Sequence, residues 1–209
     1  EDLGAIACRI LVPGYSEIYP VEDLVWDNTN KSLLFRADIL NLHRLDDAKL
    51  RSLLERLVGG ELDEYSDIGT LIGIEFDDNT VWGQLTVLEL KLLINLALKQ
   101  FDEAQQLTGA FLQYNDNTLE RQLFYQAMDG VLEVLLDKTL VLDDYLINFR
   151  RMFGNERMDA VVGSVDGSIR FFGLTPTSMK LEGFDRHHRL IDSFKKIHKV
   201  RAKVKAKSR

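Results

Sequence analysis

"TVLELKLLINLALKQ", residues 86–100, decides the fold, and "DEAQQLTGAFLQY", residues 102–114, follows it almost without a linker. Apolar residues recur in both segments at the three- and four-residue spacing of a helix face. The two segments therefore predict a pair of amphipathic helices. A link this short favours antiparallel neighbours that pack as a hairpin.

The same helical spacing extends outward from this pair over most of the chain. Asp46 and Thr118 stand where helix N-caps are expected, and Gly59-Gly60 provides a stop signal. Residues 168–172 read as a short strand or an extended arm. The further predicted helices, which bring the total to about eight or nine, are 31–42, 47–58, 66–74, 118–137, 143–153, 155–163 and 185–203.

Consecutive helices with short links predict a mainly α fold built as an array of helical hairpins. Residues 84–117 are the best candidate for one repeat, because "Phe101-Asp102-Glu103-Ala104" is similar to the turn and small residue of a tetratricopeptide unit. Lys91, Leu92 and Phe111 depart from that consensus, and no clear second copy follows. We therefore expect tetratricopeptide-like packing of the hairpins.

Residues 5–12 differ from the rest, since they read as a β-strand that ends at Pro13-Gly14. One strand without a partner is not stable in water, so it must pair with strands supplied from elsewhere. The first residue is Glu1 and not methionine. We expect the chain to be the C-terminal piece of a longer protein, with an apolar patch around residues 5–26 left uncovered.

Composition is that of an ordinary globular protein, with 45% hydrophobic and 28% charged residues. The sequence contains no apolar run long enough to span a bilayer and no recognisable signal peptide. Cys8 is the single cysteine, which suits a reducing compartment and is read as a buried small hydrophobe. These features favour a cytoplasmic location without membrane contact.

Charge is distributed unevenly along the chain. Residues 195–209 hold eight Lys or Arg and no acid, so the preceding 194 residues carry about −15 against a total of −7. Two interpretations fit this basic helix end. In the first it is a solvated end at which the helix dipole favours cations. In the second it contacts the phosphates of RNA. The first interpretation is favoured, since no aromatic residue follows Phe194 to stack on a base.

A catalytic constellation is not evident in the sequence. Glu75, Asp77 and Asp78 cluster in "EFDDN", but one short run rarely surrounds a hard cation, and a helix cap for the segment after Trp82 is the favoured role. "GSVDGS", 163–168, lacks a phosphate-binding lysine and reads as a helix stop and a turn. The spacing of the four histidines does not suit a shared metal. We predict no catalytic, cofactor-binding or metal-binding residue.

Longer stretches of the sequence resemble the YcaO family. The resemblance is carried by "CRILVPGYSEIYPVEDLVWDNTNK" (8–31), "TLIGIEFDDNTVWGQLTVLELKLLI" (70–94), "AFLQYNDNTLERQLFYQA" (110–127) and the segment 148–198. It covers nearly the whole chain and is similar to the C-terminal part of the standalone type. YcaO domains bind ATP and magnesium in an α/β fold, and their nucleotide-binding residues lie upstream of this stretch. None of those residues maps onto residues 1–209, and the proline-rich end of azoline-forming members is absent.

The resemblance implies a division of the chain and a role. Residues 1–30 correspond to the end of the ATP-binding domain, and residues 31–209 to a helical C-terminal domain with a basic tail. The standalone type is associated with β-methylthiolation of an aspartate in a small-subunit ribosomal protein. The resemblance thus implies a noncatalytic interaction domain, a homodimer, and a methylthiotransferase or ribosomal protein as partner. The alternative is an independent helical-repeat scaffold that binds a peptide or a ribosomal partner.

Overall fold

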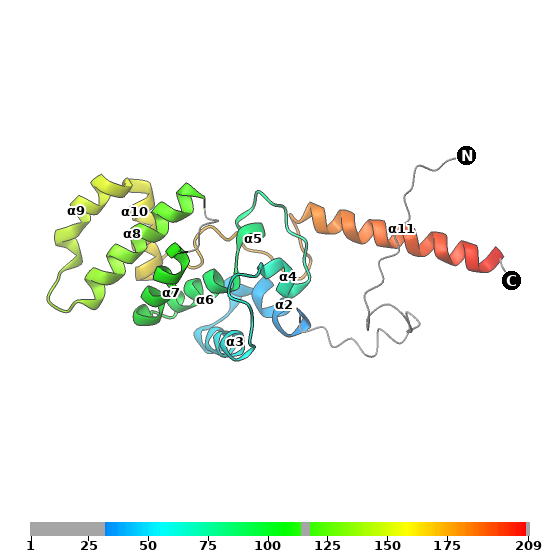
Figure 1. Ribbon diagram of the computed structural model, residues 1–209, viewed down its shortest axis with the longest axis horizontal. Helices are drawn as coiled ribbons and strands as arrows, with labels where there is room; N and C mark the ends of the chain where they lie inside the picture. Colours follow the sequence, from blue (N-terminus) through cyan, green and yellow to red (C-terminus); the bar gives the residue numbers. More distant parts are fainter. Residues whose placement is uncertain (1–31, 114–117, 208–209) are drawn as a thin grey trace. The chain divides into compact units, whose positions relative to one another are not determined.

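The structure is a computed structural model that describes residues 32–113 and 118–207. The chain divides into two units, residues 1–31 and 32–209, and the predicted strand 5–12 lies outside the described residues. Within the described part, ten α-helices and one 3-10 helix form (Figure 1). Their bounds are α2 Ser32–Leu40, η1 Leu42–Arg44, α3 Asp47–Gly59, α4 Ile68–Ile72, α5 Val81–Gln84, α6 Val87–Ala97, α7 Phe101–Gln113, α8 Leu119–Leu136, α9 Leu142–Phe153, α10 Asn155–Asp166 and α11 Asp185–Lys207.

Several predicted helix ends are confirmed by hydrogen bonds. The Asp46 carboxylate accepts a bond from the Lys49 backbone N–H at 2.9 Å and begins α3. Thr118 caps α8 in the same way through the Arg121 backbone N–H. Helix α9 ends at Phe153, the end predicted for the helix 143–153, and Gly154 follows as its C-cap. These ends could be predicted because they depend on side chains within three or four positions along the chain.

Helix α6 lies between two hydrophobic cores, and every residue from Val87 to Leu96 is buried. One side of α6 belongs to a core with α2, α3, α4 and α5, through Leu90, Leu93 and Ile94. Its other side belongs to a core with α7, α8 and α10, through Leu92 and Leu96. The prediction of an amphipathic helix is therefore wrong for this segment, because both sides of α6 are buried and its polar residues Glu89, Lys91 and Asn95 are buried with them.

The second core is built from consecutive hairpins. The most extensive helix–helix contacts are those of α7 with α8 and of α6 with α7 (Figure 1). Lys99 takes a positive φ of 58° in the short turn that reverses the chain between α6 and α7. The mainly helical fold is thus confirmed, and tetratricopeptide-like packing stays a prediction.

Three local predictions are corrected by the structure. The helix that follows Trp82 is α6, and its cap is Thr86, whose hydroxyl accepts from the Glu89 N–H, and not an Asp or Asn of residues 75–79. Helix α5, which contains Trp82, is capped by Thr80 through the Gly83 N–H. The strand alternative for residues 168–172 is wrong, because this segment forms bends and the start of a turn, and Phe171 is buried there. Helices α10 and α11 continue to Asp166 and Lys207, past their predicted ends.

Candidate interaction site

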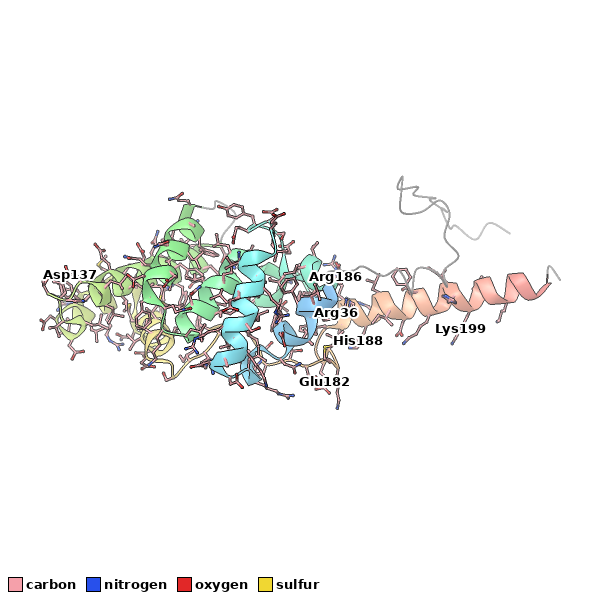
Figure 2. All side chains as sticks on the ribbon, turned by 90° about the horizontal axis from the view of Figure 1, so that it is seen from below. Arg36, Asp137, Glu182, Arg186, His188 and Lys199 are labelled. Atoms are coloured by element: carbon pink, nitrogen blue, oxygen red, sulfur yellow. The ribbon has the colours of Figure 1, made fainter. Side chains whose placement is uncertain are left out.

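The acidic run of residues 75–79 anchors the start of α11. Arg186 pairs with Glu75 at 2.9 Å and also with Asp78, while Arg189 lies 3.9 Å from Asp77. Figure 2 shows Arg186 and His188 at the base of α11. These carboxylates therefore form ion pairs with α11 and do not cap the helix that follows Trp82. In the part of the chain that the structure describes, no group of three or more His, Cys, Asp or Glu is placed to hold a metal.

Three of the four histidines have contacts that explain them structurally. The His43 ring meets Phe171 edge-on, with ring centroids 5.4 Å apart. His187 Nδ1 accepts a hydrogen bond from the Glu75 backbone N–H at 3.2 Å. A ring nitrogen of His188 lies 2.9 Å from the Leu181 carbonyl oxygen. Burial lowers the pKa of His43 and of His187, and for His187 the positive charge of Arg36 adds to that effect.

A buried polar network crosses the second core at Glu89, in the first turn of α6. Its carboxylate forms an ion pair with Arg121 of α8 and accepts a hydrogen bond of 2.8 Å from the Tyr125 hydroxyl. Burial raises the pKa of Glu89, although Arg121 and Tyr125 both act to lower it. The guanidinium of Arg121 also lies over the Phe111 ring, 5.4 Å from its centroid. The network joins α6, α7 and α8 at one point.

A pocket of about 740 Å³ opens beside Arg121. The start of α8 forms one wall, and the α9–α10 junction and Phe172 form the others. Phe172 is fixed by stacking on Phe124, with centroids 4.5 Å apart and an interplanar angle of 14°. Arg157 spans the junction: it donates to the Phe153 carbonyl and pairs with Glu120 at 2.7 Å.

The lining of this pocket combines charged side chains with aromatic rings. Glu120 and Arg157 of its lining pair with each other, Arg121 pairs with Glu89 in the core, and the walls include the rings of Phe153 and Phe172 beside Ala160. The described residues that line it contribute two carboxylates and two guanidinium groups, and no hydroxyl, thiol, imidazole or amine. A mixture of rings and paired charges suits a peptide segment with both apolar and polar side chains.

Sequence reasoning missed Arg121 and Arg157. The signal that could have revealed Arg121 is Glu89 itself, since a carboxylate among the many leucines of α6 requires a partner. That partner lies 32 positions further on, and the partner of Arg157 lies 37 positions back.

The profile of the family described as "YcaO cyclodehydratase C-terminal domain" matches residues 32–203. The chain belongs to the YcaO family. It is 30% identical, over 99% of its length, to the Escherichia coli protein named "Ribosomal protein S12 methylthiotransferase accessory factor YcaO". It is 31% identical, over 95% of its length, to an uncharacterized protein of Haemophilus influenzae.

The two matched relatives are much longer than this chain, which covers 36% of the E. coli protein and 35% of the H. influenzae protein. The matched family profile is that of a C-terminal domain, in agreement with the resemblance read from the sequence. Among the described helices, none is long and apolar enough to cross a membrane.

Proposed function

We propose that this chain is the noncatalytic interaction domain of a YcaO-type ATP-binding protein that assists β-methylthiolation of an aspartate in a small-subunit ribosomal protein. One observation carries the proposal: the similarity to the E. coli accessory factor extends along 99% of the chain. ATP and magnesium would be held by a domain upstream of this stretch, and the partner would be a methylthiotransferase or the ribosomal protein. A cytoplasmic setting follows from such a partner.

The contacts of the charged and polar residues support a noncatalytic role. Glu75, Asp77 and Asp78 hold α11, while Glu89 and Arg121 join helices within the core. Each of these groups thus has a structural use. The pocket beside Arg121 offers a surface for binding a peptide segment and supports interaction as the task of the domain.

Self-association through the helices is a further part of the proposal. Exposed apolar side chains on α9, among them Ile147 and Met152, support it because uncovered apolar area favours contact with another chain. Removal of residues 1–26 tests whether a dimer forms through the helices or through the apolar residues of that segment. If residues 27–209 sediment as a monomer at micromolar concentration, the proposed role in oligomerisation is withdrawn.

Methylthiolation in the chain's own host tests the main proposal. The codons for residues 32–209 are deleted from the chromosomal gene, and the small-subunit ribosomal protein is examined by mass spectrometry for the methylthio group on its aspartate. The proposal predicts loss of the modification, while any upstream protein that is still produced keeps its affinity for ATP. Unchanged modification would contradict the proposal.

The second candidate is an independent helical-repeat scaffold with no ATP-linked role, and the pocket beside Arg121 favours it equally. The reading frame that encodes the chain discriminates between the two. A nucleotide-binding region encoded upstream in the same frame supports the YcaO accessory role, and a gene without one supports the scaffold.

A further inference from the structure

Helix α11 carries a line of exposed apolar side chains. Leu190, Phe194, Ile197 and Val200 follow one another at intervals of four, three and three residues, so they lie along one side of the helix. Their exposed fractions are 42%, 62%, 64% and 61%. We call these four residues the α11 stripe. An uncovered apolar line of this length on one helix indicates a surface that another molecule covers.

Only the beginning of α11 is held by the other described helices and loops. Arg186 and Arg189 pair with the acidic run of residues 75–79, and His187 accepts a hydrogen bond from the Glu75 N–H. Further along, the helix extends away from the body, and Lys199 marks that part in Figure 2. The α11 stripe thus belongs to a helix that is fixed at its base and exposed beyond it.

The charge of α11 restricts what can cover the stripe. Residues Asp185–Lys207 contain nine Lys or Arg and two Asp, a net charge of +7, while the rest of the chain carries −14. Pairing with α11 of a second copy would bring two helices of net charge +7 side by side, and these like charges would repel each other. RNA would satisfy the lysines and arginines but would leave the apolar side chains uncovered.

We propose that α11 docks into a groove on a partner protein, and that this groove has an apolar floor and rims lined by carboxylates. The apolar floor would cover the α11 stripe as amphipathic helices are covered in helix-in-groove recognition. The carboxylates would neutralise the flanking lysines and arginines and select this helix over uncharged ones. The inference rests on the proposed interaction role and assigns the surface that performs it.

The test uses a labelled synthetic peptide that presents the chemistry proposed for the groove, an apolar surface flanked by carboxylates. The peptide has about three heptads, with leucine at a and d and glutamate at e and g. Its binding to the full 209-residue chain is measured by fluorescence anisotropy. Parallel titrations use a single-stranded RNA of equal negative charge and vesicles of phosphatidylglycerol with phosphatidylcholine. Ile197→Glu interrupts the stripe, and Val58→Glu on α3 is the matched control, since Val58 is 65% exposed and Ile197 64%.

We expect Ile197→Glu to weaken peptide binding at least about tenfold. We expect Val58→Glu to leave peptide binding unchanged. Circular dichroism melts check that both variants are folded. The inference is overturned if RNA or vesicles bind as tightly as the peptide, or if Ile197→Glu binds the peptide as the parent chain does. It is also overturned if the parent chain self-associates without peptide and Ile197→Glu abolishes this, because a second copy then covers the stripe.

The same variant separates this inference from the proposed function. In the host, methylthiolation that survives Ile197→Glu but is lost on deletion of residues 32–209 refutes the role of the α11 stripe and leaves the accessory function in place. Methylthiolation that survives both changes refutes the accessory function. Loss in both, with Val58→Glu unaffected, supports the two proposals together.

Discussion

Replacement of Arg121 by methionine should destabilise the domain strongly, because it removes the cation that pairs with a buried carboxylate. The side chain of Glu89 is 4% exposed and that of Arg121 17% exposed. Methionine keeps much of the length and apolar contact of the arginine stem, so the lost charge dominates the effect. After the change, Glu89 retains its hydrogen bond from the Tyr125 hydroxyl but no positive partner among the contacts described above.

The expected loss follows from the cost of an unpaired buried charge. Removal of one member of a buried ion pair costs about 3–5 kcal/mol, and the remaining Tyr125 bond places this case near about 3 kcal/mol. For a domain of this size, that corresponds to a fall in Tm of about 6–12 °C. Lys49→Met is the matched control, since Lys49 and Asp46 form an exposed pair 3.8 Å apart and should contribute less than about 0.5 kcal/mol.

Urea unfolding followed by circular dichroism measures both variants and the double variant Glu89→Gln/Arg121→Met. The double variant should recover most of the stability lost in Arg121→Met, because Glu89→Gln removes the buried carboxylate that the single variant leaves without a cation. The pH dependence gives an independent check. Burial raises the pKa of Glu89, and removal of Arg121 should raise it further, so the folded variant takes up a proton more readily than the unfolded chain.

The difference between parent and Arg121→Met should therefore be largest at neutral pH. It should shrink as the pH falls through the raised pKa of Glu89 toward the ordinary value of about 4.3. Arg121→Met with the stability of the parent at pH 7 would refute this reasoning. So would a double variant no more stable than the single one, since the cost would then arise from packing and not from the isolated carboxylate.

Three further predictions concern other parts of the described structure. Gly83→Ala should lower the free energy of unfolding by about 1–3 kcal/mol, because its new Cβ would lie 2.5 Å from a backbone oxygen. Gly109→Ala, in the open middle of α7, should raise it by about 0.5–1 kcal/mol, and thermal melts compare the two variants. The lowered pKa of His187 means that the unfolded chain binds the proton first, so stability should fall as the pH drops below about 6.5, and His187→Gln should reduce that slope. Arg186→Ala should change global stability by under about 1 kcal/mol yet speed proteolysis of α11, as followed by mass spectrometry of timed digests.

Local signals in the sequence predicted much of this fold. Asp46, Thr118 and Gly154 act within a turn of their own positions, so the helix ends that they set could be predicted from the sequence alone. Helix α6 shows where that approach stops. Its apolar spacing predicted a helix, but its burial on both sides depends on two separate cores, and each core is made by segments distant in the chain.

The charged residues could not be assigned for the same reason. Glu75 belongs to a run that resembled a cap or a cation site, yet its partner Arg186 lies more than a hundred positions away. Lys91 departed from the repeat consensus, and its ammonium is nevertheless buried in an ion pair of 2.7 Å with Glu64. Spacing within one segment carries no information on such partners, since tertiary packing alone brings them together.

Isothermal titration calorimetry with Mg-ATP tests the central claim most directly, because that claim makes this chain the noncatalytic interaction domain of a YcaO protein. The purified 209-residue chain and the full-length protein of the same gene are titrated side by side. The account predicts binding by the full-length protein and no heat of binding by the 209-residue chain up to millimolar nucleotide. Stoichiometric binding of ATP by the 209-residue chain alone would contradict it.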